Sequence, residues 1–250
     1  MNGAIRLAFL VFAIDLLVVS GVVIGWFPFH PIVLMVPLVG LVNYTIEGRN
    51  SNGLGLKPVD LLPTLAVAGI FAVLALGRYV LALRIAGIPL RTPNPTLATV
   101  LMLVRTVVVD IFIIALYEEI VNRGFIQTRL QATWGFWGVV IATVLFVSLH
   151  IPSSVLHLRP DPAALVFRLL QVGLVGFLLA FVYWRTESVV PTIAIHGLSN
   201  VSYSLSQQLS GRTGLEIVTT QIPIQFLWVI VQVGFVLWVA DRLFPRDYPA

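Results

Sequence analysis

The chain has 250 residues, of which 58% are hydrophobic and only 10% are charged, and its mean hydropathy is +0.98. This composition excludes an ordinary soluble domain and indicates an integral membrane protein. The net charge of +4 arises from 15 Lys and Arg residues scattered along the chain, so we expect no nucleic-acid partner, and the absence of cysteine excludes disulfides, thiolate metal sites and cysteine nucleophiles.

Apolar stretches of the length that crosses a bilayer recur along the whole chain. They predict an all-α, polytopic membrane protein with about eight transmembrane helices, arranged as a single membrane domain over residues 1–250. In chain order the predicted spans are 4–26, 31–46, 60–87, 97–121, 134–151, 163–184, 189–208 and 222–243. The second span contains Pro37 and the seventh is interrupted by polar residues, so a count of seven is the alternative.

Basic residues in the loops predict the orientation of the bundle. An even number of spans places both termini on one side, and that side has slightly more Lys and Arg than the other. The first set is Arg6, Arg49, Lys57, Arg129, Arg185, Arg242 and Arg246, and the second is Arg84, Arg91, Arg159, Arg168 and Arg212. The positive-inside rule therefore predicts a multi-pass protein of the cell membrane with cytoplasmic termini. Loops rich in Gly, Pro, Asn and Ser are expected at 47–60, 88–96 and 151–162.

The run LYEEIVNRGF places two adjacent carboxylates near the end of the fourth predicted span. Glu119 and Arg123 are four residues apart, in the favourable order for an ion pair on one helix face. Glu118 lies about 100° around the helix from Glu119, so it can point elsewhere. The structural alternative is an ion pair at a helix end with no further role.

The run FVSLHIP follows on the next predicted helix. Phe146 and His150 share one face of this helix, and Pro152 is expected to end it. If the chain reverses around residues 133–135, an antiparallel hairpin brings Glu118 and His150 to similar depth. Taken alone, His150 is typical of an interfacial or hydrogen-bonded histidine.

The run IAIHGLSN in the seventh span places His196 and Asn200 on one face, with Gly197 and Ser199 allowing close helix approach. Small-residue packing is the structural alternative. However, polar residues on three nominally apolar helices can satisfy one another only if they converge on one pocket. We therefore predict that these three runs meet.

Other polar residues in the spans show no comparable pattern. We interpret them as pairing or interface residues, and the two remaining histidines as loop residues. The first group is Asp15, Arg78, Arg105 and Asp110, and the second is His30 and His157.

Three stretches in this order resemble the motifs of the CAAX prenyl protease and bacteriocin-processing family of intramembrane proteases. The stretches are EExxxR at Glu118, Glu119 and Arg123, FxxxH at Phe146 and His150, and HxxxN at His196 and Asn200. The resemblance covers a core of about residues 100–205, with helices in 1–90 and 222–243 as surrounding spans. One departure is Asn122, where members of the family often have an aromatic residue.

The resemblance implies an intramembrane endopeptidase of the type II CAAX prenyl endopeptidase kind. Its partners would be the lipid bilayer and a membrane-associated protein or peptide substrate, prenylated in the best-known branch. It implies Glu118 as the general base that activates a water together with His150, while His196 and Asn200 face the developing oxyanion. Glu119, Arg123 and Phe146 would support the site.

Several alternatives stay open at this point. No metal is favoured, because no HExxH motif occurs, but a zinc ion held by Glu118, His150 and His196 is the rival mechanism. A non-catalytic membrane scaffold or bacteriocin self-immunity protein is the second hypothesis, and a transporter is the third. The sequence does not set the oligomeric state.

Overall fold

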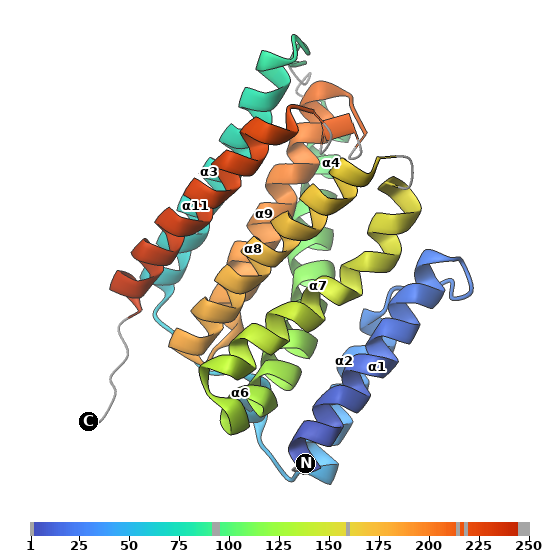
Figure 1. Ribbon diagram of the computed structural model, residues 1–250, viewed down its shortest axis with the longest axis vertical. Helices are drawn as coiled ribbons and strands as arrows, with labels where there is room; N and C mark the ends of the chain where they lie inside the picture. The colour runs from blue at the N-terminus through green and yellow to red at the C-terminus, as the bar shows by residue number, and fades with distance from the viewer. Residues whose placement is uncertain (1–2, 92–95, 159–160, 214–215, 218–219, 245–250) are drawn as a thin grey trace.

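The computed structural model describes residues 3–91, 96–158, 161–213, 216–217 and 220–244. Within these ranges the protein is helical and contains no strand, which confirms the predicted all-α fold. The α-helices form one bundle (Figure 1). They are α1 Gly3–Val23, α2 Ile32–Leu41, α3 Leu61–Ile85, α4 Leu97–Val109, α5 Leu116–Glu119, α6 Thr128–Trp134, α7 Phe136–Leu158, α8 Pro162–Thr186, α9 Val189–Ser210 and α11 Ile222–Leu243. The short π-helical segments η1 Val42–Ile46, η3 Asp110–Ala115 and η4 Ile120–Gln127, and the 3-10 turn η2 Ser51–Leu54, join or extend them.

Each predicted span corresponds to a helical segment of the structure. Among the described residues, six segments are long and apolar enough to cross a membrane. They are Gly3–Val23, Leu61–Ile85, Leu97–Trp134, Phe136–Leu156, Pro162–Thr186 and Ile222–Leu243. The two others are the predicted second and seventh spans: Ile32–Ile46 is short, and α9 carries many polar residues. The start of α1 and the end of α11 lie at the same end of the bundle (Figure 1), as an even number of crossings requires.

The fourth predicted span is longer than expected. Instead of ending near residue 121, the helix continues to Trp134 through η3, α5, η4 and α6. Charged residues lie on both sides of the predicted end, and they would be costly in lipid. These residues do not face lipid, because Glu119 and Arg123 are 0% and 1% exposed inside the bundle. The helix therefore continues, and its π-helical turns flank the carboxylates.

The fifth helix does not end at Pro152, contrary to the prediction. α7 continues through Pro152 to Leu158, so His157 lies in a helix and the predicted loop at 151–162 is helical as far as residue 158. Proline removes one backbone N–H donor, and serine hydroxyls commonly satisfy backbone groups near such a site in membrane helices. Ser153 Oγ donates to the carbonyl of His150 at 3.2 Å. The helix thereby keeps His150 well inside its length.

The turn between α6 and α7 is where the hairpin was predicted. Gly135 adopts a positive φ of 54°, which only glycine takes readily, and it separates Trp134 from Phe136. α7 then runs back beside α6 and η4 and packs on α8 on its other side. The register of this hairpin sets the relative depth of Glu118 and His150.

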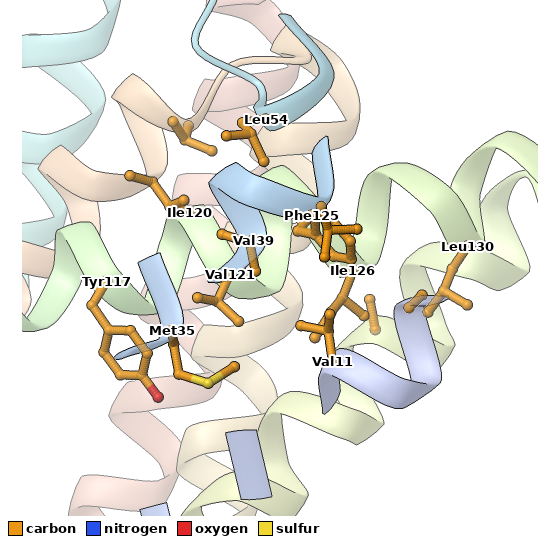
Figure 2. Packing of buried hydrophobic residues seen from close by; sticks show 14 of the residues in the cluster. Val11, Met35, Val39, Leu54, Tyr117, Ile120, Val121, Phe125, Ile126 and Leu130 are labelled. Atoms are coloured by element: carbon orange, nitrogen blue, oxygen red, sulfur yellow. The ribbon is translucent and has the colours of Figure 1, made fainter. Parts of the chain in front are cut away.

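Two apolar clusters hold the bundle on either side of this hairpin. One joins α1 and α2 to the long helix, and Figure 2 shows Val121 beside Val39 and Ile126 near Val11. The other joins α3, α8, α9 and α11, with Phe71 and Leu179 among its fully buried members. The central helices therefore have packing partners on both sides.

Arg129, which was expected among the loop residues, is instead fully buried at the end of the hairpin. Its guanidinium forms an ion pair with Glu47, donates to Asn43 Oδ1 at 3.1 Å and to the carbonyl of Gly53 at 3.1 Å, and stacks 3.5 Å from the ring centroid of Phe125. A single side chain thus ties α6 to the segment after α2.

We predict that Arg129→Ala lowers the free energy of unfolding by about 3 kcal/mol, because it removes a fully buried guanidinium that holds the Glu47 carboxylate, whose side chain is 9% exposed, and three backbone and side-chain acceptors. Arg212→Ala is the matched control. It removes an ion pair to Glu216 whose side chains are 46% and 45% exposed, so its effect should stay below about 1 kcal/mol. Thermal unfolding of the purified protein in detergent measures both, and equal effects would contradict the assigned role of Arg129.

Candidate active site

The three polar runs meet in the middle of the bundle, around one cavity of about 390 Å³. Glu118 reaches it from α5, Phe146 and His150 from α7, and His196 and Asn200 from α9. Residues of α3, η3 and α8 complete the wall. Glu119 and Arg123 do not line this cavity and lie behind it, fully buried.

Glu118 lies between the two histidines. Its Oε2 is 3.8 Å from Nε2 of His150 and 3.8 Å from Nε2 of His196. Both distances are longer than a direct hydrogen bond. Oε2 is also buried and has no hydrogen-bond partner among the described residues. The Glu118 carboxylate and the two imidazoles thus lie close together at the cavity, with Oε2 enclosed near both Nε2 atoms.

Backbone contact fixes the ring of His150. Its Nδ1 lies 2.9 Å from the carbonyl oxygen of Phe146, four residues earlier on α7. A carbonyl oxygen can only accept, so Nδ1 carries the proton and donates. In the neutral ring, Nε2 is then an acceptor directed toward Glu118.

Glu119 has partners on its own helix and on α9. The ion pair with Arg123 that the spacing predicted is present, with Arg123 Nε 3.4 Å from Glu119 Oε2. In addition, His196 Nδ1 donates to Glu119 Oε1 at 2.8 Å. This second contact was not predicted, because spacing within one helix cannot show which face of α9 it meets. Glu119 thus sets the tautomer of His196 and turns its Nε2 toward Glu118.

Arg123 connects this buried ion pair to Phe146 on α7 and to Gly176 on α8. The guanidinium of Arg123 lies 4.0 Å from the Phe146 ring centroid, and Arg123 Nη2 donates to the carbonyl of Gly176 at 3.2 Å. A Cβ on Gly176 would come within 2.9 Å of the Phe146 ring, so this position requires glycine. The ring also lies edge-on to His196, with 6.2 Å between centroids.

Gly197 and Asn122 support the helical segments that carry His196 and Glu118. A Cβ on Gly197 would lie 2.7 Å from Cγ1 of Ile111, so glycine allows α9 to approach η3 next to His196. Asn122, the departure from the family pattern, is buried and donates to the backbone carbonyl of Glu118 at 2.9 Å. It therefore supports the same turn that presents Glu118.

The cavity has further polar lining that the sequence did not indicate as part of a site. These residues are Tyr79, Asp110, Arg168, Gln171, Ser199, Tyr203, Ser204 and Gln207. Asp110, interpreted as a pairing residue, accepts a hydrogen bond from Ser204 at 2.9 Å, while Arg105 is exposed. Ser204 and Gln207 continue the three-to-four-residue periodicity of His196 and Asn200. This spacing could have identified them as residues of the same helix face.

The remaining polar residues have structural partners. Tyr117 donates to Asp15 Oδ1 at 2.5 Å, and Arg78 donates to the amide oxygen of Gln171 at 2.8 Å when that amide is oriented toward it. His30 lies in the loop between α1 and α2, as predicted. Asp15 is fully buried and Arg78 nearly so, which agrees with their interpretation as pairing residues.

The donor set also bears on a metal. Two imidazoles and a carboxylate are the chemistry of a catalytic zinc site. However, no group of three His, Asp or Glu side chains in the described part of the chain is arranged so that it could hold a metal ion. Glu118, His150 and His196 therefore have the chemistry of zinc ligands, but their positions do not allow them to hold one metal ion together.

Comparison with known proteins bears on the same region. Residues 98–202 match the family model described as Type II CAAX prenyl endopeptidase Rce1-like. Neither a curated protein nor a solved structure matches the chain. The matched residues contain all three motifs and nearly coincide with the predicted core of 100–205, which confirms the resemblance. Residues 98–202 of this membrane protein thus form an Rce1-like domain of the type II CAAX prenyl endopeptidase family.

Proposed function

We propose that this protein is an intramembrane endopeptidase that hydrolyses a peptide bond of a membrane-associated protein or peptide. The observation that carries the proposal is the position of Glu118. Its carboxylate lies in a cavity within the bundle, unpaired at Oε2 and at equal distance from two histidines. An ionisable group in such surroundings is costly to bury. Such a residue is therefore by default a candidate for a functional role.

In this mechanism Glu118 is the general base. A water held between Glu118 and Nε2 of His150 loses a proton to the carboxylate as its oxygen attacks the substrate carbonyl. His150 can accept a hydrogen bond from the same water, because its Nδ1 proton is engaged by the Phe146 carbonyl. Glu118 then returns the proton to the leaving amine.

His196 and Asn200 are proposed to stabilise the oxyanion. An imidazolium at His196 would keep Nδ1–H on Glu119 and present Nε2–H to the developing negative charge. The Asn200 amide lines the same cavity and is one turn along α9. Glu119, Arg123 and Phe146 act as positioning residues. They hold His196 and the helices α7 and α8, and the mechanism assigns none of them a contact with the reacting atoms.

A zinc-dependent mechanism makes a different prediction for the same residues. With the metal-free mechanism proposed here, a strong chelator should leave cleavage unchanged, since the side chains alone activate the water. Loss of cleavage on treatment with 1,10-phenanthroline, restored by zinc, would overturn it.

We also propose that the domain lies in the cell membrane with both termini in the cytoplasm. The support is the excess of basic residues on the side of the termini. A reporter enzyme that is active only in the cytoplasm, fused after Ala250, should be active, and an inactive but intact fusion would reverse the orientation.

The proposed base predicts a specific loss of products. Glu118→Gln should remove protein termini that the wild type generates in membranes and slow their formation by about 10²-fold or more, the usual contribution of a general base. Glu187→Gln is the control, since Glu187 lies at the end of α8 and pairs with Lys57. Mass spectrometry of termini at matched expression compares the three. Identical termini in all three would instead support the scaffold or immunity hypothesis.

The oxyanion assignment gives a second expectation. Asn200→Ala should lower kcat about 10²-fold, the typical loss for one oxyanion donor, with a smaller change in KM. Gln208→Ala is the control on the same helix, because its amide donates to Thr106 and does not line the cavity. The assay uses a fluorescence-quenched peptide carrying a Glu118-dependent cleavage site. An Asn200→Ala protein with normal kcat would remove Asn200 from the mechanism.

A further inference from the structure

A second, smaller cavity lies on the other side of Glu118. It measures about 100 Å³ and is separate from the larger cavity described above. Its lining residues are Val19, Tyr117, Glu118, Leu149, His150 and Ser153. Glu118 and His150 are common to both cavities.

The shared residues form a wall between the two spaces. α5 and α7 contribute to both cavities, while α8 and α9 complete the larger one and α1 completes the smaller one. Figure 1 shows α7 between α1 on one side and α8 on the other. Glu118 and His150 therefore line a cavity on the α8 and α9 side and another on the α1 side.

The size and chemistry of the smaller cavity suit water. Each water occupies about 30 Å³ in the liquid and needs two to four polar partners. Ser153 Oγ donates to the His150 carbonyl and the Tyr117 hydroxyl donates to Asp15, so both hydroxyl oxygens keep lone pairs that can accept from water. A peptide segment needs several hundred Å³, on the order of the larger cavity.

The smaller cavity also lies near a loop. Val19 is four residues, about 6 Å of helix, before the end of α1 at Val23. The loop that follows carries Trp26, which is 77% exposed and of the type that favours the membrane interface. The ring of His30 in this loop meets Tyr117 edge-on, with 5.6 Å between centroids. The smaller cavity therefore lies about one helical turn from this loop.

We propose that the smaller cavity supplies the hydrolytic water to Glu118 from the α1 side while the substrate peptide occupies the larger cavity on the α8 and α9 side. This inference rests on the proposed protease function. It gives Val19, Leu149 and Ser153 a role in admitting water, although none of them contacts the substrate.

Filling the smaller cavity tests the proposal. Val19→Phe should lower kcat about tenfold or more and leave KM nearly unchanged, because it excludes water without touching the peptide site. Leu17→Phe is the control: it adds the same ring to α1 at a position that is 70% exposed, and it should behave as wild type. The readout is the quenched peptide with a Glu118-dependent cleavage site.

A second variant and a stability measurement distinguish loss of water access from a folding defect. Ser153→Leu fills the same space from α7, and thermal unfolding in detergent reports whether each variant is folded. Folded Val19→Phe or Ser153→Leu protein with wild-type kcat would overturn the water route, as would a rise in KM at constant kcat. Either result leaves the protease proposal standing, which fails only if the wild type and Glu118→Gln generate identical termini.

Discussion

The arrangement of the site depends on how Glu119 is neutralised inside the bundle. This carboxylate is fully buried, and burial of an unpaired charge would cost several kcal/mol. Arg123 on the same helix and His196 on α9 share the neutralisation. The first contact is local, but the second joins segments 77 positions apart in the chain. Removing the carboxylate would therefore leave Arg123 buried without its charge partner and free the His196 ring to rotate.

The same ion pair extends to the other helices of the site. Arg123 stacks on Phe146 of α7 and donates to the Gly176 carbonyl of α8, so one guanidinium contacts three helical segments. His150 is held in turn by the carbonyl of Phe146. The buried pair therefore orients His196, whereas the backbone of Phe146, whose side chain lines the cavity, orients His150.

The sequence predicted much of this fold because the dominant signal in a membrane protein is apolar length. All eight spans correspond to helices, and the turn at Gly135 placed Glu118 and His150 at similar depth. The incorrect predictions arose because helix-breaking residues were interpreted from the neighbouring sequence alone. Pro152 does not end α7, and the charged turn does not end the fourth span, because protein surrounds both. The contact of Glu119 with His196 and the role of Arg168 as cavity lining depend on helix rotation, which periodicity in a hydrophobic chain barely encodes.

The two adjacent glutamates have different surroundings inside the bundle. Glu119 has a cation and an imidazole as direct partners, with a hydrogen bond at Oε1 and an ion pair at Oε2. Glu118 Oε2 has no hydrogen bond among the described residues and is held at 3.8 Å from two imidazole nitrogens. A direct partner at either position would stabilise the protein but would occupy the lone pairs that a base needs. If Glu118 is the proposed base, its missing hydrogen bond is the kind of local cost that functional sites retain.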